Sequence, residues 1–169
     1  MIIDDRYNGG GFIPDRMIEL LSRKTLNYWK FRGLKPNATP LIAHDGPKAM
    51  LINGYSSSGG DALPYYFRKL GLGKLIGTRT WGGLIGISGN PDLADGGLLL
   101  AATFRTMDTD GNWIVENIGV SPDIEVIDRP ELIHAGHDPV LERAIKELLK
   151  DLDVNPRKSI KAPAAPTQF

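Results

Sequence analysis

Residues 53–65 read Asn53-Gly54-Tyr55-Ser56-Ser57-Ser58-Gly59-Gly60-Asp61-Ala62-Leu63-Pro64-Tyr65, and they place small residues between an apolar run and an amphipathic segment. The apolar run 49–52 predicts a buried strand, and the segment after Asp61 predicts a helix that ends near Leu70. A sharp turn at a helix start leaves backbone N–H groups unpaired where the helix dipole favours negative charge. A serine in this turn is placed to attack a carbonyl carbon. The alternative is an ordinary loop, since Ser and Gly are common in turns.

A second glycine-rich turn repeats this design at the start of the chain. Residues 1–12 read Met1-Ile2-Ile3-Asp4-Asp5-Arg6-Tyr7-Asn8-Gly9-Gly10-Gly11-Phe12, a short apolar strand followed by glycines, and a helix is predicted from Pro14 to Leu21. The turn lacks the Lys-Ser/Thr ending of a P-loop and the glycine spacing of a dinucleotide site. We therefore interpret it as the source of backbone amides for an oxyanion hole beside Ser58.

Four segments in the same order and spacing resemble the tail-specific (C-terminal processing) peptidases and, within them, the tricorn protease branch. They are residues 8–11, 53–61, 77–87 and 115–123, so the resemblance extends over most of the chain. It implies an α/β fold of crotonase-like βαβ layers with a C-terminal helix, and hydrolysis of peptides through an acyl-enzyme without a cofactor. It also implies that Ser58 is the nucleophile, rather than Ser56 or Ser57. The oxyanion donors would be the N–H of Gly59 and one N–H from the Gly10-Gly11 turn.

The two branches of this family activate the serine differently. Tail-specific proteases use a lysine, and Gly83 occupies that position here. Tricorn proteases use a histidine, oriented by a second serine and a glutamate, and Glu116 stands at the glutamate position. A carboxylate there stabilises the orienting chain and the imidazolium that forms. Without the resemblance, Glu116 would be interpreted as an exposed carboxylate at a strand end.

The resemblance also implies that the base histidine lies upstream of the strand that begins at Ile2. We therefore expect residues 1–152 to be the C-terminal part of a catalytic domain, inactive alone, that joins upstream propeller or PDZ-like modules in a homo-oligomer. His44 is interpreted as a solvated loop residue. His134 and His137 precede the helix cap expected at Asp138, and no third metal ligand is evident, so no metal site is expected.

Trp81, Gly82 and Gly83 are weaker candidates for contacts with a peptide substrate, because aromatic residues at such positions more often belong to the core. Gly59 favours a second hypothesis, since an Asp follows the nucleophile in tricorn proteases. In that hypothesis the chain is a catalytically inactive peptide-binding or scaffold domain. A third possibility for a crotonase-like fold is an acyl-CoA enzyme.

The amino-acid composition mainly excludes classes of function. Twenty Lys and Arg balance 20 Asp and Glu, and the sequence pI of about 6.8 gives no basic field for nucleic acid. No apolar stretch has the length of a membrane span, and the chain lacks cysteine. The compartment stays open: the resemblance favours the cytoplasm, and an upstream signal peptide would indicate the periplasm.

The remaining pattern predicts where further elements lie. Strands are expected at Ile2–Asp4 and Lys74–Gly77, a strand or ribbon at Thr25–Phe31, a loop at Leu34–Thr39, and a hairpin pairing Leu98–Met107 with Trp113–Val115. The last helix is expected from Asp138 to about Leu152. Its apolar stripe, formed by Leu141, Ile145, Leu148, Leu149 and Leu152, would pack on the core or on another subunit. Residues 153–169 are expected to form a disordered tail.

Overall fold

A four-stranded parallel sheet forms the centre of the protein, whose computed structural model describes residues 1–156 and 160–164. Its strand order is β1-β4-β5-β6, with bounds Ile2–Asp4, Ala49–Ile52, Lys74–Gly77 and Ile124–Glu125. Met50 of β4 pairs with Ile3 on one side and with Leu75 on the other. The first three strands have the predicted bounds because each is a short apolar run between turn residues.

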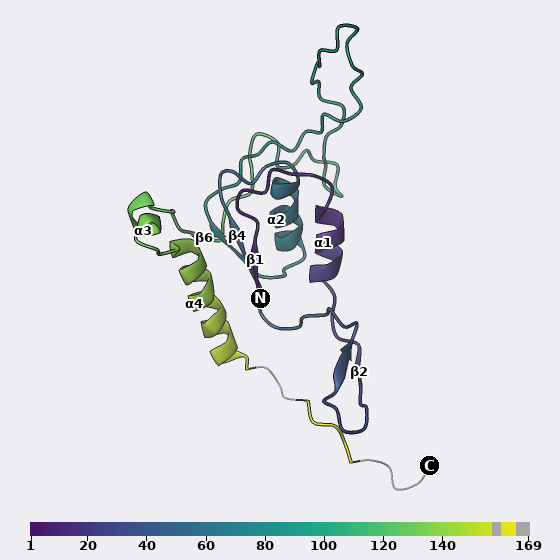
Figure 1. The fold of residues 1–169 in the computed structure, drawn as a ribbon, viewed down its shortest axis with the longest axis vertical. Coiled ribbons are helices and arrows are strands. Elements are labelled where there is room, and N and C mark those ends of the chain that lie inside the picture. Colours follow the sequence, from purple (N-terminus) through teal and green to yellow (C-terminus); the bar gives the residue numbers. More distant parts are fainter. Residues whose placement is uncertain (157–159, 165–169) are drawn as a thin grey trace.

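Helices cover both faces of the sheet (Figure 1). Helices α1 (Pro14–Leu21) and α2 (Gly59–Lys69) lie on one face, and α4 (Pro139–Val154) lies on the other. Side chains alternate along β4, so Met50 and Ile52 pack with the α1 and α2 side while Ala49 and Leu51 pack with α4. Burying each large apolar side chain stabilises the folded protein by roughly 1.5–3 kcal/mol. This burial holds the connection from β4 to α2 between two packed layers.

Helix α4 confirms the predicted last helix, with a rotated buried face. Val140, Ala144 and Leu148 are buried against the sheet, whereas Ile145 is 44% exposed and Leu149 57% exposed. The small Ala144 permits the close approach of the helix to the strands, so the contact line runs one residue earlier than the leucine pattern indicates. The predicted apolar stripe is therefore divided between core and surface.

An ion-pair cluster joins the end of β1 to the start of α4. The Arg6 guanidinium lies 2.8 Å from the carboxylates of both Asp4 and Asp138. Asp138 is also the helix cap, as predicted, since its Oδ1 accepts the N–H of Leu141 at 2.9 Å. The first strand and the last helix are thus held together by a charge-assisted contact.

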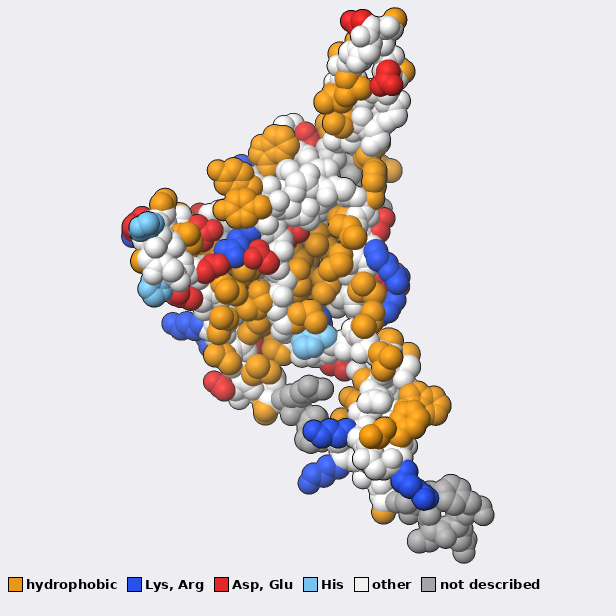
Figure 2. Space-filling model, in the orientation of Figure 1, with side chains coloured by type: hydrophobic (Ala, Val, Ile, Leu, Met, Phe, Trp, Pro, Cys, Tyr) orange, Lys and Arg blue, Asp and Glu red, His pale blue; other side chains and the backbone are white. Residues whose placement is uncertain are grey.

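Two excursions extend away from the layered body (Figure 1). One is an antiparallel ribbon of β2 (Asn27–Trp29) and β3 (Asn37–Thr39), so the loop predicted at Leu34–Thr39 was wrong in its second half. Polar residues form β3 because β2 supplies its hydrogen bonds, a pairing that local sequence does not indicate. The other is an arm of residues 86–104, whose exposed apolar side chains are visible at the top of Figure 2.

The remaining segments differ in part from the sequence-based expectations. The predicted hairpin is reduced, among the described residues, to one antiparallel bridge between Met107 and Trp113 around a turn at Asp108. The short helix α3 (Pro130–His134) was not predicted. The predicted tail begins too early, because residues 153 and 154 belong to α4, and its positions 157–159 and 165–169 lie outside the described residues.

Within the part of the chain that the structure describes, no helix combines the length and the apolar character needed to cross a membrane.

Candidate active site

Ser58 lies in a strained turn between β4 and α2. It is the N-cap of α2 with φ +55° and ψ −112°, a left-handed conformation that residues other than glycine seldom adopt. Such backbone strain costs on the order of 1–3 kcal/mol and persists where surrounding contacts determine it. Here the Ser58 N–H donates to the carbonyl of Gly83 at 3.0 Å and to Asp61 Oδ2 at 2.9 Å. The turn has the strand-to-helix form of a nucleophile elbow.

Asp61 is the buried residue that joins this turn to the next loop. Its Oδ1 accepts the N–H of Gly82 at 2.8 Å, and its Oδ2 accepts the N–H of Gly83 at 3.1 Å as well as that of Ser58. This role of Asp61 was not among the predictions from the sequence. The Ser-x-x-Asp spacing of a capping box was the available signal, since the third helical residue reaches back to the cap.

The three consecutive serines have different environments. Ser56 is fully buried, and its hydroxyl donates to the carbonyl of Asp5 at 2.8 Å. The Ser57 N–H donates to the carbonyl of Asn8 at 2.9 Å. Only Ser58 of the three lines the described pocket. This environment agrees with the choice of Ser58 over Ser56 and Ser57. The assignment of Ser58 as the catalytic serine stays a prediction.

The glycine-rich loop after β1 packs directly against the start of α2. A Cβ built on Gly59 would overlap the carbonyl oxygen of Gly11, and one built on Gly10 would lie 2.7 Å from the Ser58 Cβ. The Gly10 N–H donates to the Asn8 side chain at 3.0 Å. No acceptor among the described residues takes the N–H of Gly59 or Gly11. Of the predicted oxyanion donors, Gly59 and Gly11 therefore have available amides, whereas the Gly10 amide is occupied.

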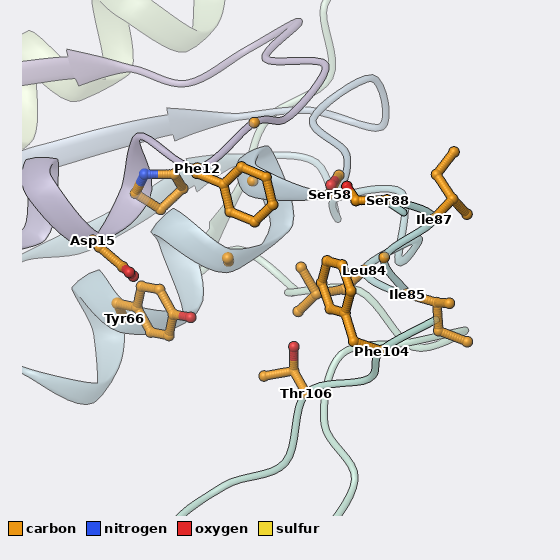
Figure 3. A pocket seen from close by; sticks show the side chains of 15 residues that line it. Phe12, Asp15, Ser58, Tyr66, Leu84, Ile85, Ile87, Ser88, Phe104 and Thr106 are labelled. Atoms are coloured by element: carbon orange, nitrogen blue, oxygen red, sulfur yellow. The ribbon is translucent and has the colours of Figure 1, made fainter. Parts of the chain in front are cut away.

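A pocket of about 320 Å³ opens beside Ser58 (Figure 3). Apolar side chains form much of its wall, among them Phe12, Leu84, Ile87 and Phe104. Asp15 and Tyr66 lie at the end away from Ser58 in Figure 3, and burial, with a smaller contribution from the Asp15 charge, raises the pKa of Tyr66. The pocket can thus hold an apolar group next to the serine and offers polar contacts at its other end.

Glu116 shapes one wall of this pocket. Its Oε2 accepts the N–H groups of Leu84 at 2.6 Å and Ile85 at 2.8 Å, and both of these residues line the pocket. Its neighbours Val115 and Asn117 have φ values of +67° and +61°, and a positive φ is rare for a β-branched residue. No described residue donates to Glu116 Oε1. One carboxylate oxygen therefore orders the wall, and the other is open to a further donor.

The weaker substrate-binding candidates, Trp81, Gly82 and Gly83, lie in the loop after β5. The Trp81 side chain is exposed and its ring packs over Gly83, while the backbone N–H of Trp81 donates to the Ser56 carbonyl at 2.9 Å. Gly82 and Gly83 donate to Asp61. None of the three residues lines the described pocket. Their structural role is to support the Ser58 turn, and their contact with a substrate stays a prediction.

The described pocket lining contains neither histidine nor lysine. His134 lies in α3, and His137 Nδ1 is 3.1 Å from Glu142 Oε1 at the start of α4. His44 lies in the loop before β4. Among the described residues, no group of three or more side chains of the metal-binding types is arranged to hold a metal ion.

Comparison with known proteins adds independent findings. The profile described as Peptidase family S41 matches residues 1–126. The tricorn protease of Thermoplasma volcanium is 40% identical over 153 residues, which are 90% of this chain and 15% of that protein. Tricorn protease homolog 1 of Streptomyces coelicolor is 37% identical over 94% of this chain and 15% of its own length. The chain thus spans about 15% of the length of these relatives.

Solved structures agree with the sequence matches. A crystal structure of the tricorn protease superposes with a TM-score of 0.85 at 40% identity, covering 90% of this chain and 15% of that chain. The photosystem II D1 C-terminal processing protease superposes with a TM-score of 0.54 at 24% identity, over 87% of this chain and 38% of that chain. The second likeness shows a shared fold alone. The mixed α/β arrangement with a parallel sheet is common to these proteins.

Proposed function

This chain belongs to peptidase family S41, as its resemblance to tricorn proteases predicted, and on that premise we propose that it supplies the nucleophile and the oxyanion hole of a serine peptidase. The observation that carries the proposal is the Ser58 turn. A strained serine lines a pocket, and the available N–H groups of Gly59 and Gly11 lie in the two packed glycine turns beside it. Donors held in place before the reaction stabilise the charge that develops on a tetrahedral intermediate.

In the proposed reaction, Ser58 Oγ attacks the carbonyl carbon of a peptide bond. The carbonyl oxygen becomes an oxyanion that accepts hydrogen bonds from Gly59 and Gly11. The proton of the serine passes to a histidine and then to the leaving amine, which separates from the acyl-enzyme. Water, deprotonated by the same histidine, then hydrolyses the ester and frees Ser58.

The base histidine is proposed to come from a segment upstream of Met1 in the same polypeptide. Two observations support this assignment: no histidine faces Ser58 in the described pocket, and the tricorn relatives are several times longer than this chain. Glu116 Oε1, which has no described donor, is the proposed acceptor for the serine that orients this histidine. Upstream propeller or PDZ-like modules, a homo-oligomeric assembly and a crotonase-like core for the catalytic domain belong to the same proposal.

A second candidate function is an inactive peptide-binding domain, and Gly59 favours it. The residue after the nucleophile is an Asp in the tricorn proteases that this chain resembles, whereas here the Gly11 carbonyl fills the space of any side chain at position 59. A contact that an Asp would make is therefore missing. The backbone N–H of Gly59 is still present, and a backbone donor is sufficient for an oxyanion, so the peptidase is the better supported candidate.

A serine-directed fluorophosphonate probe separates the two functions. In the full-length polypeptide we expect labelling and peptidase activity that Ser58→Ala abolishes and Ser57→Ala largely retains. Ser57 is the matched control because it lies in the same turn without lining the pocket. The isolated chain should hydrolyse no peptide. Absent labelling of folded full-length protein would favour the binding domain, and labelling lost only in Ser57→Ala would show that the nucleophile is the neighbouring serine.

A further inference from the structure

A buried carboxylate lies beneath the proposed oxyanion turn. Asp5 directly follows β1 and is 2% exposed. Its backbone is fixed on both sides: its N–H donates to the Leu51 carbonyl at 3.0 Å, and its carbonyl accepts the Ser56 hydroxyl at 2.8 Å. Its Oδ1 accepts the Asn8 side-chain amide at 2.8 Å, while Oδ2 has no partner among the described residues. A buried carboxylate with one oxygen that has no hydrogen-bond partner costs folding free energy, so its presence here needs a reason.

Asn8 connects this carboxylate to both glycine-rich turns. Its Nδ2 donates to Asp5, its Oδ1 accepts the N–H of Gly10 at 3.0 Å, and its carbonyl accepts the N–H of Ser57 at 2.9 Å. An asparagine amide has donors at one end and an acceptor at the other. Because Oδ1 of Asp5 is the acceptor in this contact, the NH₂ end of the Asn8 amide faces Asp5 and its oxygen faces Gly10. The reversed amide would place an NH₂ group against the Gly10 N–H.

The orientation of Asn8 in turn determines which amide is available for the reaction. With Asn8 Oδ1 holding the Gly10 N–H, the Gly11 N–H remains without a described partner, beside the Gly59 turn. Gly10 packs against the Ser58 side chain, so a shift of the loop would move the donor relative to the nucleophile. Hydrogen bonds to a developing oxyanion depend on donor distances near 3 Å.

From these contacts we propose that Asp5 is a positioning residue for the peptidase reaction, which holds the Gly9–Gly11 loop through the Asn8 amide and so aligns the Gly11 N–H with that of Gly59. The inference rests on the proposed function. It assigns Asp5 no contact with the substrate. The feature that matters is an acceptor oxygen at the position of Oδ1, whatever the charge of the side chain.

The charge state of the Asp5 carboxyl group is a second feature of this contact. Burial raises the pKa of Asp5 to about 7, the hydrogen bond from Asn8 opposes the rise, and the charges of Asp61 in α2 and Asp4 in β1 add to it. The carboxyl group is therefore close to half protonated near neutral pH. Both forms offer an oxygen to Asn8, so an uncharged amide at this position should serve as well.

Two variants of the same shape separate the acceptor from the packing. Asp5→Asn keeps an oxygen for Asn8 and places its NH₂ where Oδ2 has no partner, whereas Asp5→Leu keeps the branched shape and removes the acceptor. In the full-length enzyme we expect Asp5→Leu to lower kcat about 10- to 100-fold, somewhat less than complete loss of an oxyanion donor, with KM changed less than about 3-fold. Asp5→Asn should stay within about 3-fold of the wild-type kcat.

A double-mutant cycle provides the second readout and does not depend on either Asp5 variant alone. Asn8→Ala should lower kcat and the rate of fluorophosphonate labelling by a similar factor, and adding Asp5→Leu should lower them no further, because both act through one connection. Thermal unfolding reports which variants fold, and Asn8→Ala carries the test if Asp5→Leu does not.

The outcomes distinguish this inference from the proposed function. A folded Asp5→Leu or Asn8→Ala enzyme with wild-type kcat, an equal loss in Asp5→Asn and Asp5→Leu, or additive losses in the double variant would each overturn the positioning role while leaving the peptidase intact. A wild-type enzyme that neither cleaves peptides nor labels at Ser58 would overturn the proposed function, and the positioning role with it.

Discussion

The carboxylate of Asp61 accepts the backbone N–H of Ser58 at 2.9 Å, so the third residue of α2 holds the residue that begins the helix. The same carboxylate accepts two N–H groups of the loop after β5, those of Gly82 and Gly83. A single buried side chain thereby fixes the Ser58 turn and the loop that leads to the pocket wall. Three charge-assisted hydrogen bonds at one site are a substantial part of a domain's marginal stability.

Asp61→Asn should therefore destabilise the protein and slow the reaction. An amide has one oxygen for three donors, and its NH₂ group would face a backbone N–H. Leaving buried donors unpaired costs about 1–3 kcal/mol each, so we expect the free energy of unfolding to fall by roughly 2–4 kcal/mol. Urea denaturation measures the loss. Asp110→Asn, in an exposed turn, is the control, and equal stability of the two variants would contradict the role assigned to Asp61.

Glu116→Gln should slow acylation of the full-length enzyme by about 10²- to 10⁴-fold, the range expected when a carboxylate that supports the base is lost. Stopped-flow measurement of acyl-enzyme formation reports the rate. The fold should change little, because a glutamine oxygen still accepts the N–H groups of Leu84 and Ile85. Glu125→Gln, on the exposed end of β6, serves as the control. An unchanged acylation rate in Glu116→Gln would remove Glu116 from the catalytic site.

Gly59→Ala should disrupt the contact between the two glycine-rich turns. Its methyl group would overlap the Gly11 carbonyl, and backbone at such a contact has little freedom to move. We expect a loss of about 1–3 kcal/mol in stability, as for overpacked interiors, together with slower labelling of Ser58. Gly9→Ala is the matched control, because no heavy atom lies within 4 Å of its added Cβ. Differential scanning calorimetry of both variants tests the contrast, and a tolerated Gly59→Ala would show that the turns are less tightly packed.

The buried Asp5 should make stability depend on pH. Its pKa is raised from 3.8 in the unfolded chain to about 7 in the folded protein, so the folded state binds the proton more tightly. This contribution is fully present below about pH 4 and is lost as the pH rises through 7. Asp5→Asn carries no charge, so its stability relative to wild type should increase from pH 5 to pH 8, by at most about 3 kcal/mol. Urea denaturation at four pH values measures the difference, and a constant difference would mean that Asp5 titrates normally.

The sequence predicted the parts of the fold that depend on local pattern. The bounds of β4 and β5 are correct because each is a short apolar run between turn residues, buried on both faces. Helix α1 follows from its proline start and apolar spacing. The place of Ser58 between a strand and a helix also follows from local residues. By contrast, β3 and β6 are two or three residues long and exist through pairing with other strands, which no local pattern reveals.

The candidate site was predictable only where its chemistry lies in adjacent residues. Ser58 and Gly59 are neighbours in the sequence, and Glu116 became a candidate through the resemblance to tricorn proteases. The contacts of Asp61 with Gly82 and Gly83 were missed because these partners are about twenty residues away. Asp5 was missed because its role depends on Asn8 and on burial. A carboxylate in a sequence indicates a charge, whereas the number of N–H groups it accepts is decided by folding.

The contact between the Gly9–Gly11 loop and the start of α2 also restricts how this site can diverge among relatives. Neither Gly59 nor Gly60 has room for a Cβ, because the carbonyls of Gly11 and Asn8 fill the two spaces. Mutations on the two sides are therefore not independent. A lineage that acquires a side chain at the position after Ser58 must first, or simultaneously, move the loop of residues 8–11 away. We expect positions 59 and 60 to covary with that loop, so exchanging one segment between relatives without the other should give inactive chimaeras.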